Sequence, residues 1–430
     1  MLRNLFRFAI SFAVVASFVI PVLAQNRQAT VAHSVVDKLL AAPEHQDIPW
    51  KVNFFPPRLM YQQMYLVQIR ARVDLNAMKK IDVVRALHFV ARAQGEDGKW
   101  LQGGEYKDYP VPANLGSETE IEYAVAVYFR PGNYTLTLAV FDADSEKSSI
   151  AREMIRIPKL NDDPIPELNQ YLPAAEFAKG FPDREVGNDR ADDGELFPVM
   201  LEGKPVPVAN TRPVLVDIVL NITKRPKPQI PQYLDRYGRP VREWHRPTVP
   251  SIPSYDMEVG RVLQTGNLLA RLGLESGCVR VSAVDALRMK TMIDRADEKT
   301  LDWVRFEKQI KSFDQDTVDV GVLTNKKGPA QFMRRYLDQL SSDSGACGAS
   351  ATHYIVIVTH EVAFPAKDQK LPAVDRERAR FYYLYSQLGS MGDDLADLLK
   401  PVKPERLSFN TPRDLRKAFA KILFDLKSGK

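Results

Sequence analysis

The side chains best suited to chemistry lie between residues 345 and 361. Gly345 to Ser350 places a cysteine and a serine in a glycine-rich stretch, His353 follows, and His360-Glu361 ends the region. A nucleophile needs a base beside it, and a zinc peptidase needs a second histidine four positions after the first. Neither pattern is complete, and the chain has no Gly-x-Ser-x-Gly elbow and no phosphate-binding glycine loop. The sequence therefore favours a non-catalytic protein.

Cys278 and Cys347 are the only cysteines of the chain. In an oxidising compartment such a pair predicts a single disulfide, although the residues alone leave two buried free thiols as the alternative. Neither cysteine has a histidine or a second cysteine at the spacing of a zinc site. We expect no cofactor.

Residues 1–24 are typical of a secretory signal peptide. Two arginines open the segment, an apolar run from Phe8 to Ile20 follows, and a proline precedes the small residue Ala24. The alternative is an uncleaved membrane anchor, but the proline and the small residue favour cleavage. The expected mature protein begins at Gln25, is exported to the periplasm or the medium, and has no membrane span after cleavage.

Length and charge limit the remaining classes of protein. The chain has 430 residues, a length for which we expect two or three domains. Its hydrophobic fraction of 45% is ordinary for a globular protein. The formal charge of +5 becomes +3 without the two arginines of the signal peptide. A nucleic-acid partner is not expected, because no concentrated basic face accompanies this small excess.

The first part of the mature chain has the pattern of a β-sandwich. After a leader segment, residues 25–49, alternating or β-rich runs recur through residues 50–158, with a tight turn at Arg130 to Asn133. The expected fold is all-β and Ig-like. The strands are expected at Tyr65–Val73, Ala86–Ala91, Ile121–Phe129 and Tyr134–Phe141.

Composition changes twice further along the chain. Residues 159–211 are acidic and rich in proline, which predicts a semi-extended linker. From residue 212 to 427, continuous apolar strands alternate with helical stripes, which predicts an α/β domain with a doubly wound, mostly parallel sheet. The expected strands are Val214–Leu220, Val279–Val284, Val318–Leu323, Tyr354–Val358 and Phe381–Tyr385.

Three helices are expected from apolar stripes of helical spacing. They are centred on Trp303 to Phe313, on Met333 to Leu340 and on Leu415 to Leu426. Thr411 as N-cap and Pro412 as first helical residue mark the start of the last helix. We expect the three stripes to face the core.

This order of elements resembles a von Willebrand factor A (VWA) domain, in the diverged form that follows a β-sandwich in some exported bacterial proteins. The resemblance covers residues 212–427 and implies a divalent cation site at the carboxyl edge of the sheet. In the family, an Asp-x-Ser-x-Ser loop, a threonine and a Thr-Asp-Gly turn supply hard oxygen ligands. Here the first motif reads Asp217 to Asn221 and the turn reads Thr359-His360-Glu361.

The metal site implied by the resemblance is degenerate in this sequence. Val219 replaces the first serine of the loop, and His360 replaces a carboxylate. The threonine ligand of the family could correspond to Thr317 or to Thr324. A weak site for Mg²⁺ or Ca²⁺ would have to use Asp217, Asn221 and Glu361; the alternative is that Asp217 is a structural polar residue.

A proline-rich insertion, residues 224–255, takes the place of the metal loop. Its aromatic residues suit contact with a protein, and in open α/β sheets ligands bind at the edge where this insertion begins. The alternative is that the insertion packs on the sandwich. The interaction candidates are Tyr233, Tyr237, Trp244 and Tyr255. The resemblance also places Cys278 and Cys347 together at the opposite edge of the sheet, which favours the disulfide.

These observations predict an exported, non-catalytic protein of the adhesion or assembly type that binds other proteins. Two alternatives stay open. One is an exported hydrolase whose site is too dispersed to recognise, and the other is a VWA-like binder that keeps a weak cation site.

Overall fold

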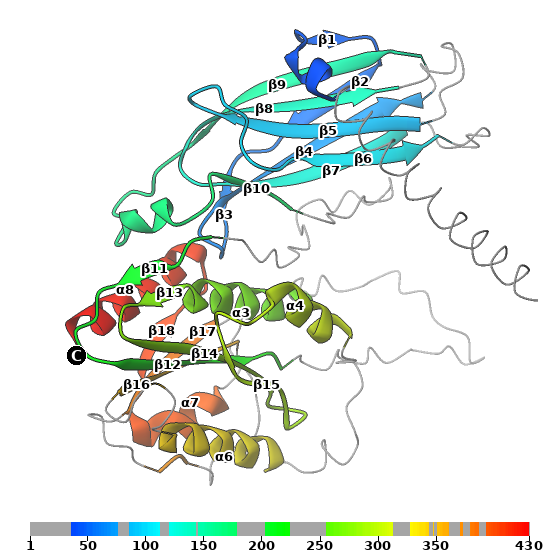
Figure 1. Ribbon diagram of the computed structural model, residues 1–430. Coiled ribbons are helices and arrows are strands. Elements are labelled where there is room, and N and C mark those ends of the chain that lie inside the picture. Colours follow the sequence, from blue (N-terminus) through cyan, green and yellow to red (C-terminus); the bar gives the residue numbers. More distant parts are fainter. Residues whose placement is uncertain are drawn as a thin grey trace, which may run out of the picture.

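The chain forms a β-sandwich and, below it in Figure 1, a second sheet covered by helices. The architecture comes from a computed structural model. It describes residues 36–75, 86–111, 120–142, 145–178, 203–223, 255–312, 327–343, 347, 351–360, 370–372, 379–386 and 393–429.

The sandwich consists of two antiparallel sheets. One has the order β1-β9-β8-β5-β6 and the other β10-β7-β4-β2, with β3 also paired to β4. The strands are β1 (His45–Gln46), β2 (Trp50–Phe54), β3 (Arg58–Leu59), β4 (Tyr65–Asp74), β5 (Ala86–Gly95), β6 (Glu105–Pro110), β7 (Glu120–Phe129), β8 (Gly132–Phe141), β9 (Ser148–Ile157) and β10 (Ala175–Phe177).

Alternation of side chains produces the core of the sandwich. In β4, Val67, Ile69 and Ala71 are fully buried between the sheets, whereas Arg70 and Arg72 point outward. The four expected strands all form, and the expected turn joins β7 to β8.

The leader segment is partly an element of the sandwich. Residues 36–41 are helical, and Val36 and Leu40 pack on Ile150 and other residues of the outer face of the β9-β8-β5 sheet. The Arg152 guanidinium holds this helix by donating to the carbonyl oxygens of Leu40, at 2.9 Å, and of Ala42.

The second half of the chain forms a six-stranded sheet of order β15-β14-β12-β16-β17-β18. Neighbours from β14 to β18 pair in parallel, and β15 pairs with β14 in antiparallel fashion. A two-stranded parallel ribbon, β11 with β13, lies beside it. These strands are β11 (Val206–Val208), β12 (Val214–Asn221), β13 (Leu272–Leu274), β14 (Gly277–Asp285), β15 (Lys290–Asp297), β16 (Thr352–His360), β17 (Ala379–Ser386) and β18 (Glu405–Ser408).

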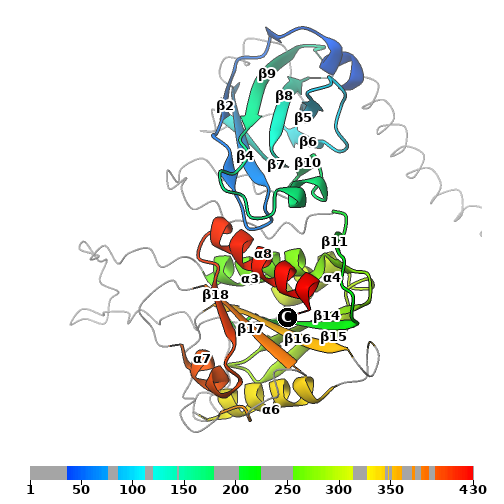
Figure 2. The same ribbon diagram turned by 90° about the vertical axis from the view of Figure 1, so that its left-hand side faces the viewer.

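Helices cover this sheet on both faces (Figures 1 and 2). The face nearer the sandwich carries α3 (Tyr255–Ala270), α4 (Trp303–Ser312) and α8 (Pro412–Ser428). The other face carries α6 (Gly328–Ser342), α7 (Asp394–Leu399) and the short 3₁₀ turn η2 (Lys400–Val402). The predicted cap of α8 is present as a capping box between Thr411 and Asp414. Every helix within the described ranges falls short of the length or apolarity needed to cross a membrane.

The predicted fold class, with a doubly wound parallel α/β domain in residues 212–427, is wrong. The described residues are predominantly β, with 45% of them in strands and 26% in helices, and several of the sheets are antiparallel. One physical reason lies at the end of β14, where the Asp285 carboxylate accepts from the Arg288 backbone N–H at 3.0 Å and pairs with its guanidinium at 2.8 Å. This turn sends the chain straight back as β15, a hairpin that the sequence pattern did not reveal. The expected strand Val318–Leu323 lies outside the described residues.

Residues assigned to the proline-rich linker join the two halves. The 3₁₀ helix η1 (Pro166–Gln170) and its neighbours contribute Ile165, Leu168 and Leu172 to the core that also contains α3 and α8. Further on, β10 joins the sandwich and β11 pairs with β13. The segment therefore builds the junction between sandwich and sheet, and only residues 179–202 lie outside the described part.

Candidate functional site

The structure separates Asp217 from Asn221, two of the three residues of the residual metal site. Asp217 lies in the middle of β12 and Asn221 is its last residue, so four positions of about 3.3 Å each lie between them. Glu361 lies outside the described residues, as do Tyr233, Tyr237 and Trp244. Tyr255 is the first residue of α3.

At the carboxyl edge of the sheet, Asn221 belongs to a buried network of polar groups. Its amide nitrogen donates to the Thr359 hydroxyl at 3.0 Å, and its amide oxygen accepts from the Thr223 hydroxyl at 2.6 Å. The Thr223 hydroxyl also accepts from the Ala286 N–H at 2.7 Å, and the His360 ring bonds the Thr223 carbonyl oxygen at 2.5 Å. The network joins the ends of β12, β14 and β16.

These hydrogen bonds occupy the position in which the VWA resemblance places a cation. A hard cation requires several oxygen ligands, including carboxylates, whereas the oxygens of Asn221 and Thr223 here accept from N–H and O–H groups. Among the described residues, no three His, Cys, Asp or Glu side chains gather closely enough to hold a metal.

We therefore expect the thermal midpoint of the protein to be the same in EDTA as in millimolar Ca²⁺ or Mg²⁺. An ion held only by the native state at 100 times its Kd would add about 2.7 kcal/mol to the free energy of unfolding. Differential scanning calorimetry measures the midpoint. A fall in EDTA that Ca²⁺ reverses would contradict this expectation, and Asn221→Ala would then test whether the ion lies in this network.

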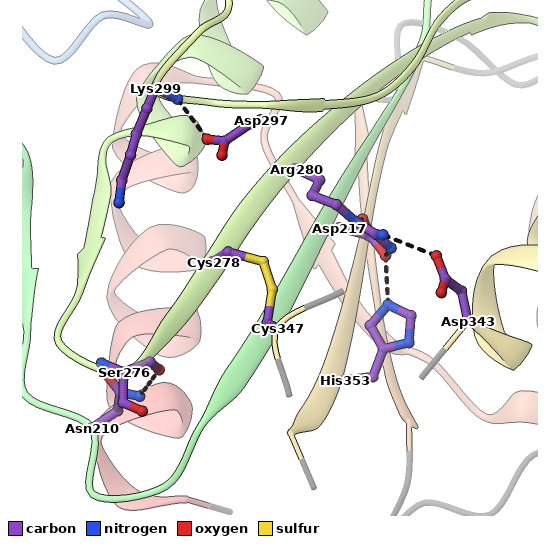
Figure 3. The surroundings of a disulfide bond; sticks show 10 residues. All are labelled: Asn210, Asp217, Ser276, Cys278, Arg280, Asp297, Lys299, Asp343, Cys347 and His353. Carbon is purple, nitrogen blue, oxygen red and sulfur yellow. Dashed lines mark hydrogen bonds and ion pairs between the residues drawn. A yellow bond between two sulfur atoms is a disulfide. The ribbon is translucent and has the colours of Figure 1, made fainter. Parts of the chain in front are cut away.

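At the opposite edge, Cys278 and Cys347 form a disulfide, as predicted. Cys278 is the second residue of β14, and Cys347 lies between α6 and β16 (Figure 3). Their Cα atoms are 5.9 Å apart, within the range that a disulfide spans. The bond crosses the start of β12, because β12 lies between β14 and β16 in the sheet.

A buried charged network begins two residues after Cys278. The Arg280 guanidinium donates to both carboxylate oxygens of Asp217, from Nε at 2.7 Å and from Nη2 at 2.6 Å. The Asp217 carboxylate also contacts Nε2 of His353 at 2.6 Å. Asp217 and Arg280 are register partners in β12 and β14, and Asp217 is only 1% exposed.

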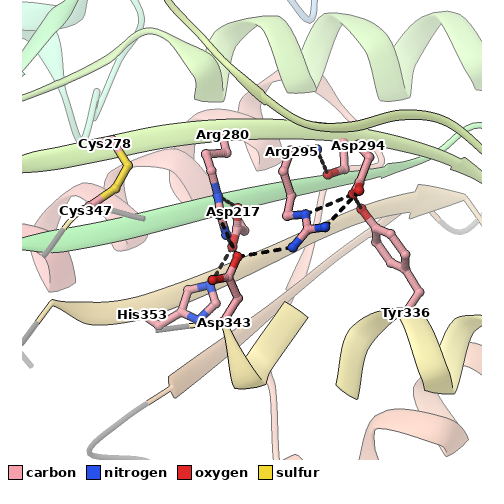
Figure 4. A network of polar contacts seen from close by, with 10 residues as sticks. Asp217, Cys278, Arg280, Asp294, Arg295, Tyr336, Asp343, Cys347 and His353 are labelled. Carbon is pink, nitrogen blue, oxygen red and sulfur yellow. Dashed lines mark hydrogen bonds and ion pairs between the residues drawn. A yellow bond between two sulfur atoms is a disulfide. The ribbon is translucent and has the colours of Figure 1, made fainter. Parts of the chain in front are cut away.

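The network continues toward the surface (Figure 4). Asp343, the C-cap of α6, accepts from Arg280 at 2.9 Å and from Arg295 at 3.2 Å. Arg295 also pairs with Asp294 at 3.0 Å, and the Tyr336 hydroxyl donates to Asp294 at 3.1 Å. Burial, followed by the charge of Asp294 and a hydrogen bond to it, raises the pKa of Tyr336.

The charges of this network compensate one another. For Arg280, burial lowers the pKa, but hydrogen bonds and charge attraction from Asp217 and then Asp343 outweigh that effect and raise it. A pKa raised in the folded state contributes stability below the ordinary arginine range and loses it only above that range. Arg280 is therefore cationic at physiological pH, and its two carboxylate partners stabilise that charge.

Sequence reasoning found Asp217 but missed Arg280, His353 and Asp343 as its partners. The expected strand Val214–Leu220 contained Asp217 without assigning it a partner, and the observed strand extends one residue further, to Asn221. A usable signal was present, because Asp217 and Arg280 each interrupt an otherwise apolar strand at a buried position. Charges at such positions need partners.

The sandwich also brings residue types common in catalysis together around His88. Nδ1 of His88 contacts the Asp108 carboxylate at 2.5 Å, and the Tyr106 hydroxyl lies 2.8 Å from the same nitrogen. Burial, with a smaller contribution from Asp108, raises the pKa of Tyr106. A general-base relay uses both ring nitrogens, one toward the nucleophile and the other toward the carboxylate. Since both partners share Nδ1, this arrangement is not a relay.

The sequence matches no protein-family model and no curated protein. A chicken interferon gamma receptor alpha chain structure has 12% identity and a TM-score of 0.16, covering 26% of this chain and 51% of that one. Northeast Structural Genomics Consortium target SoR45 has 10% identity and a TM-score of 0.16, covering 27% of this chain and 89% of that one.

A glycosyl hydrolase family 2 member from Bacteroides cellulosilyticus has 6% identity and a TM-score of 0.19, covering 83% of this chain and 44% of that one. The chain thus spans about half the length of the interferon receptor chain. TM-scores this low carry no argument about fold or function, and the resemblance to VWA domains stays a prediction.

Proposed function

We propose that this chain is an exported, non-catalytic protein of the adhesion or assembly type that binds other proteins. The observation that carries the proposal is the closed network at the carboxyl edge of the six-stranded sheet. Open sheets with parallel strands bind small ligands at that edge. Here Asn221, Thr223 and Thr359 hydrogen-bond one another, so their polar groups serve the fold.

The ends of the proline-rich insertion support a role in protein contact. Residues 224–255 begin directly after Thr223, in the closed network, and end at the start of α3. The two described residues that flank it, Thr223 and Tyr255, therefore follow β12 and begin α3, at the edge that commonly serves for binding. Proline restricts the unbound backbone, which lowers the entropy lost when such a segment binds a partner.

The disulfide supports export. Disulfides between structural cysteines persist in oxidising compartments and are rare in the cytosol. The bond between Cys278 and Cys347 therefore agrees with the secretory signal predicted for residues 1–24.

A capture experiment tests the proposal. The protein starting at Gln25 is compared with a variant in which residues 226–253 are replaced by a Gly/Ser linker, using chemical cross-linking in envelope extracts and mass spectrometry. Each captured protein is then purified and titrated against both forms. We expect a direct partner whose binding is lost in the replaced variant while the thermal midpoint is unchanged.

A second variant keeps the length of the insertion, with Tyr233, Tyr237 and Trp244 changed to Ser. Loss of binding here would assign the contact to the aromatic side chains. The proposal would be overturned by reproducible hydrolytic turnover that is lost in His360→Ala and Glu361→Gln, or by partner binding that both insertion variants retain.

A further inference from the structure

The connection from α6 to β16 is attached to the sheet at three points. It leaves α6 at Asp343, which pairs with Arg280 and Arg295. It passes through Cys347, which is bonded to Cys278, and it ends near the start of β16 at His353, which contacts Asp217. Figures 3 and 4 show the disulfide and the charged residues side by side on one face of the sheet.

The positions of the three attachments follow from the alternation and the register of the strands. Side chains alternate along a strand, so Cys278 and Arg280 point to the same face of β14. The register sets Arg280 beside Asp217 in β12, and His353 and Asp217 meet from adjacent strands. Asp343 is a partner of Arg280, and His353 is a partner of Asp217. The disulfide lies between Asp343 and His353 along the chain and attaches Cys347 to β14.

We propose that the Cys278–Cys347 disulfide is a redox-sensitive clasp, whose reduction opens the buried Asp217–Arg280 pair to water while the sandwich stays folded. Asp217 and Arg280 are both buried, and a buried ion pair depends on the groups that complete its hydrogen bonds. When the middle of the connection is released, the Asp343 carboxylate is held by hydrogen bonds to Arg280 and Arg295 that water can replace, whereas His353 keeps the backbone pairing of β16 with β12 and β17.

The clasp is accessible to a reductant. Both cysteines are partly exposed, so a small dithiol can reach the bond. Its thiolate attacks one sulfur, the other leaves as a thiolate, and the second thiol of the reagent resolves the mixed disulfide. Two electrons and two protons reach the protein, which gains two thiols, and the dithiol becomes a disulfide.

The test compares amide hydrogen exchange in the oxidised and the dithiothreitol-reduced full-length protein without denaturant. Alkylation and mass spectrometry confirm the redox state. We expect the amides of Tyr354 to Val356 in β16 to exchange about tenfold faster or more after reduction, and those of Leu136 to Leu138 in β8 to keep their rates. The variant Cys278→Ser/Cys347→Ser should match the reduced protein.

Three results would overturn the clasp. One is unchanged exchange in β16 after complete reduction. Another is a disulfide that dithiothreitol reduces only in denaturant. The third is acceleration in both β16 and β8, which would make the bond a requirement of the whole fold. If the double variant does not fold, the reduced wild-type protein alone decides the question. The clasp does not depend on the proposed function.

Discussion

Replacing Arg416 by Met should lower the free energy of unfolding by about 3–5 kcal/mol, because it leaves a partly buried carboxylate at the junction without its partner. The Arg416 side chain in α8 is 2% exposed and forms a two-pronged pair with Asp163, at 2.6 and 2.7 Å. The same guanidinium donates to the Ile165 carbonyl oxygen at 3.1 Å and to the Asn169 side chain at 3.2 Å.

The residues around Arg416 form the junction between the sandwich and the six-stranded sheet. The turn between β3 and β4 reaches the start of α8, where the Tyr61 hydroxyl donates to the Asn410 carbonyl oxygen at 2.6 Å. The Gln63 amide donates to the Pro412 carbonyl oxygen at 3.0 Å. Met60, Tyr61 and Met64 share a hydrophobic core with α3 and α8. Arg416 therefore connects the sandwich, the residues after it and the last helix.

Urea unfolding followed by circular dichroism measures the effect. The matched control is Lys417→Met, which removes a neighbouring exposed cation and should change the free energy of unfolding by no more than about 0.5 kcal/mol. The pair Arg416→Met/Asp163→Leu should recover part of the loss, since removing both charges leaves neither unpaired. A single-variant loss below about 1 kcal/mol would show that the pair does not hold the junction.

Local pattern predicted individual elements of this protein better than their arrangement. The apolar runs gave β12, β14, β16 and β17, and the cap at Thr411 gave the start of α8, because propensity, periodicity and capping act within a few residues. The chain reverses into β15 at a turn where Asp285 accepts from the backbone N–H and the guanidinium of Arg288 at the end of β14. A single polar residue at such a turn does not stand out in a sequence.

The pairing of residues in the junction and in the charged network could not be predicted, because the partners lie far apart in the chain. Asp163 sits in a stretch whose proline content resembles a linker, and its partner Arg416 is 253 positions away. His353 read as a possible catalytic residue, but it meets Asp217 across adjacent strands, 136 positions away. The disulfide was predictable, since the chain offers only one pair of cysteines.

Replacing Arg280 by Met should also cost about 3–5 kcal/mol of unfolding free energy, because Asp217 would keep its buried charge and lose two of its hydrogen bonds. Arg280→Lys should cost less but remain destabilising, since an ammonium group cannot reproduce the two-pronged contact. Urea unfolding of the oxidised protein measures both. Lys299→Met removes an exposed cation just after β15 and is the matched control.

A double variant shows whether the loss of stability comes from an unpaired carboxylate or from the lost packing of the arginine side chain. If the cost arises from an unpaired carboxylate, Arg280→Met/Asp217→Leu should be more stable than Arg280→Met alone, because the apolar pair leaves no buried charge beside His353. Equal stability of the single and double variants would instead place the cost in the packing of the arginine side chain. In that case Asp343, which also accepts from Arg280 at 2.9 Å, would be the next partner to remove.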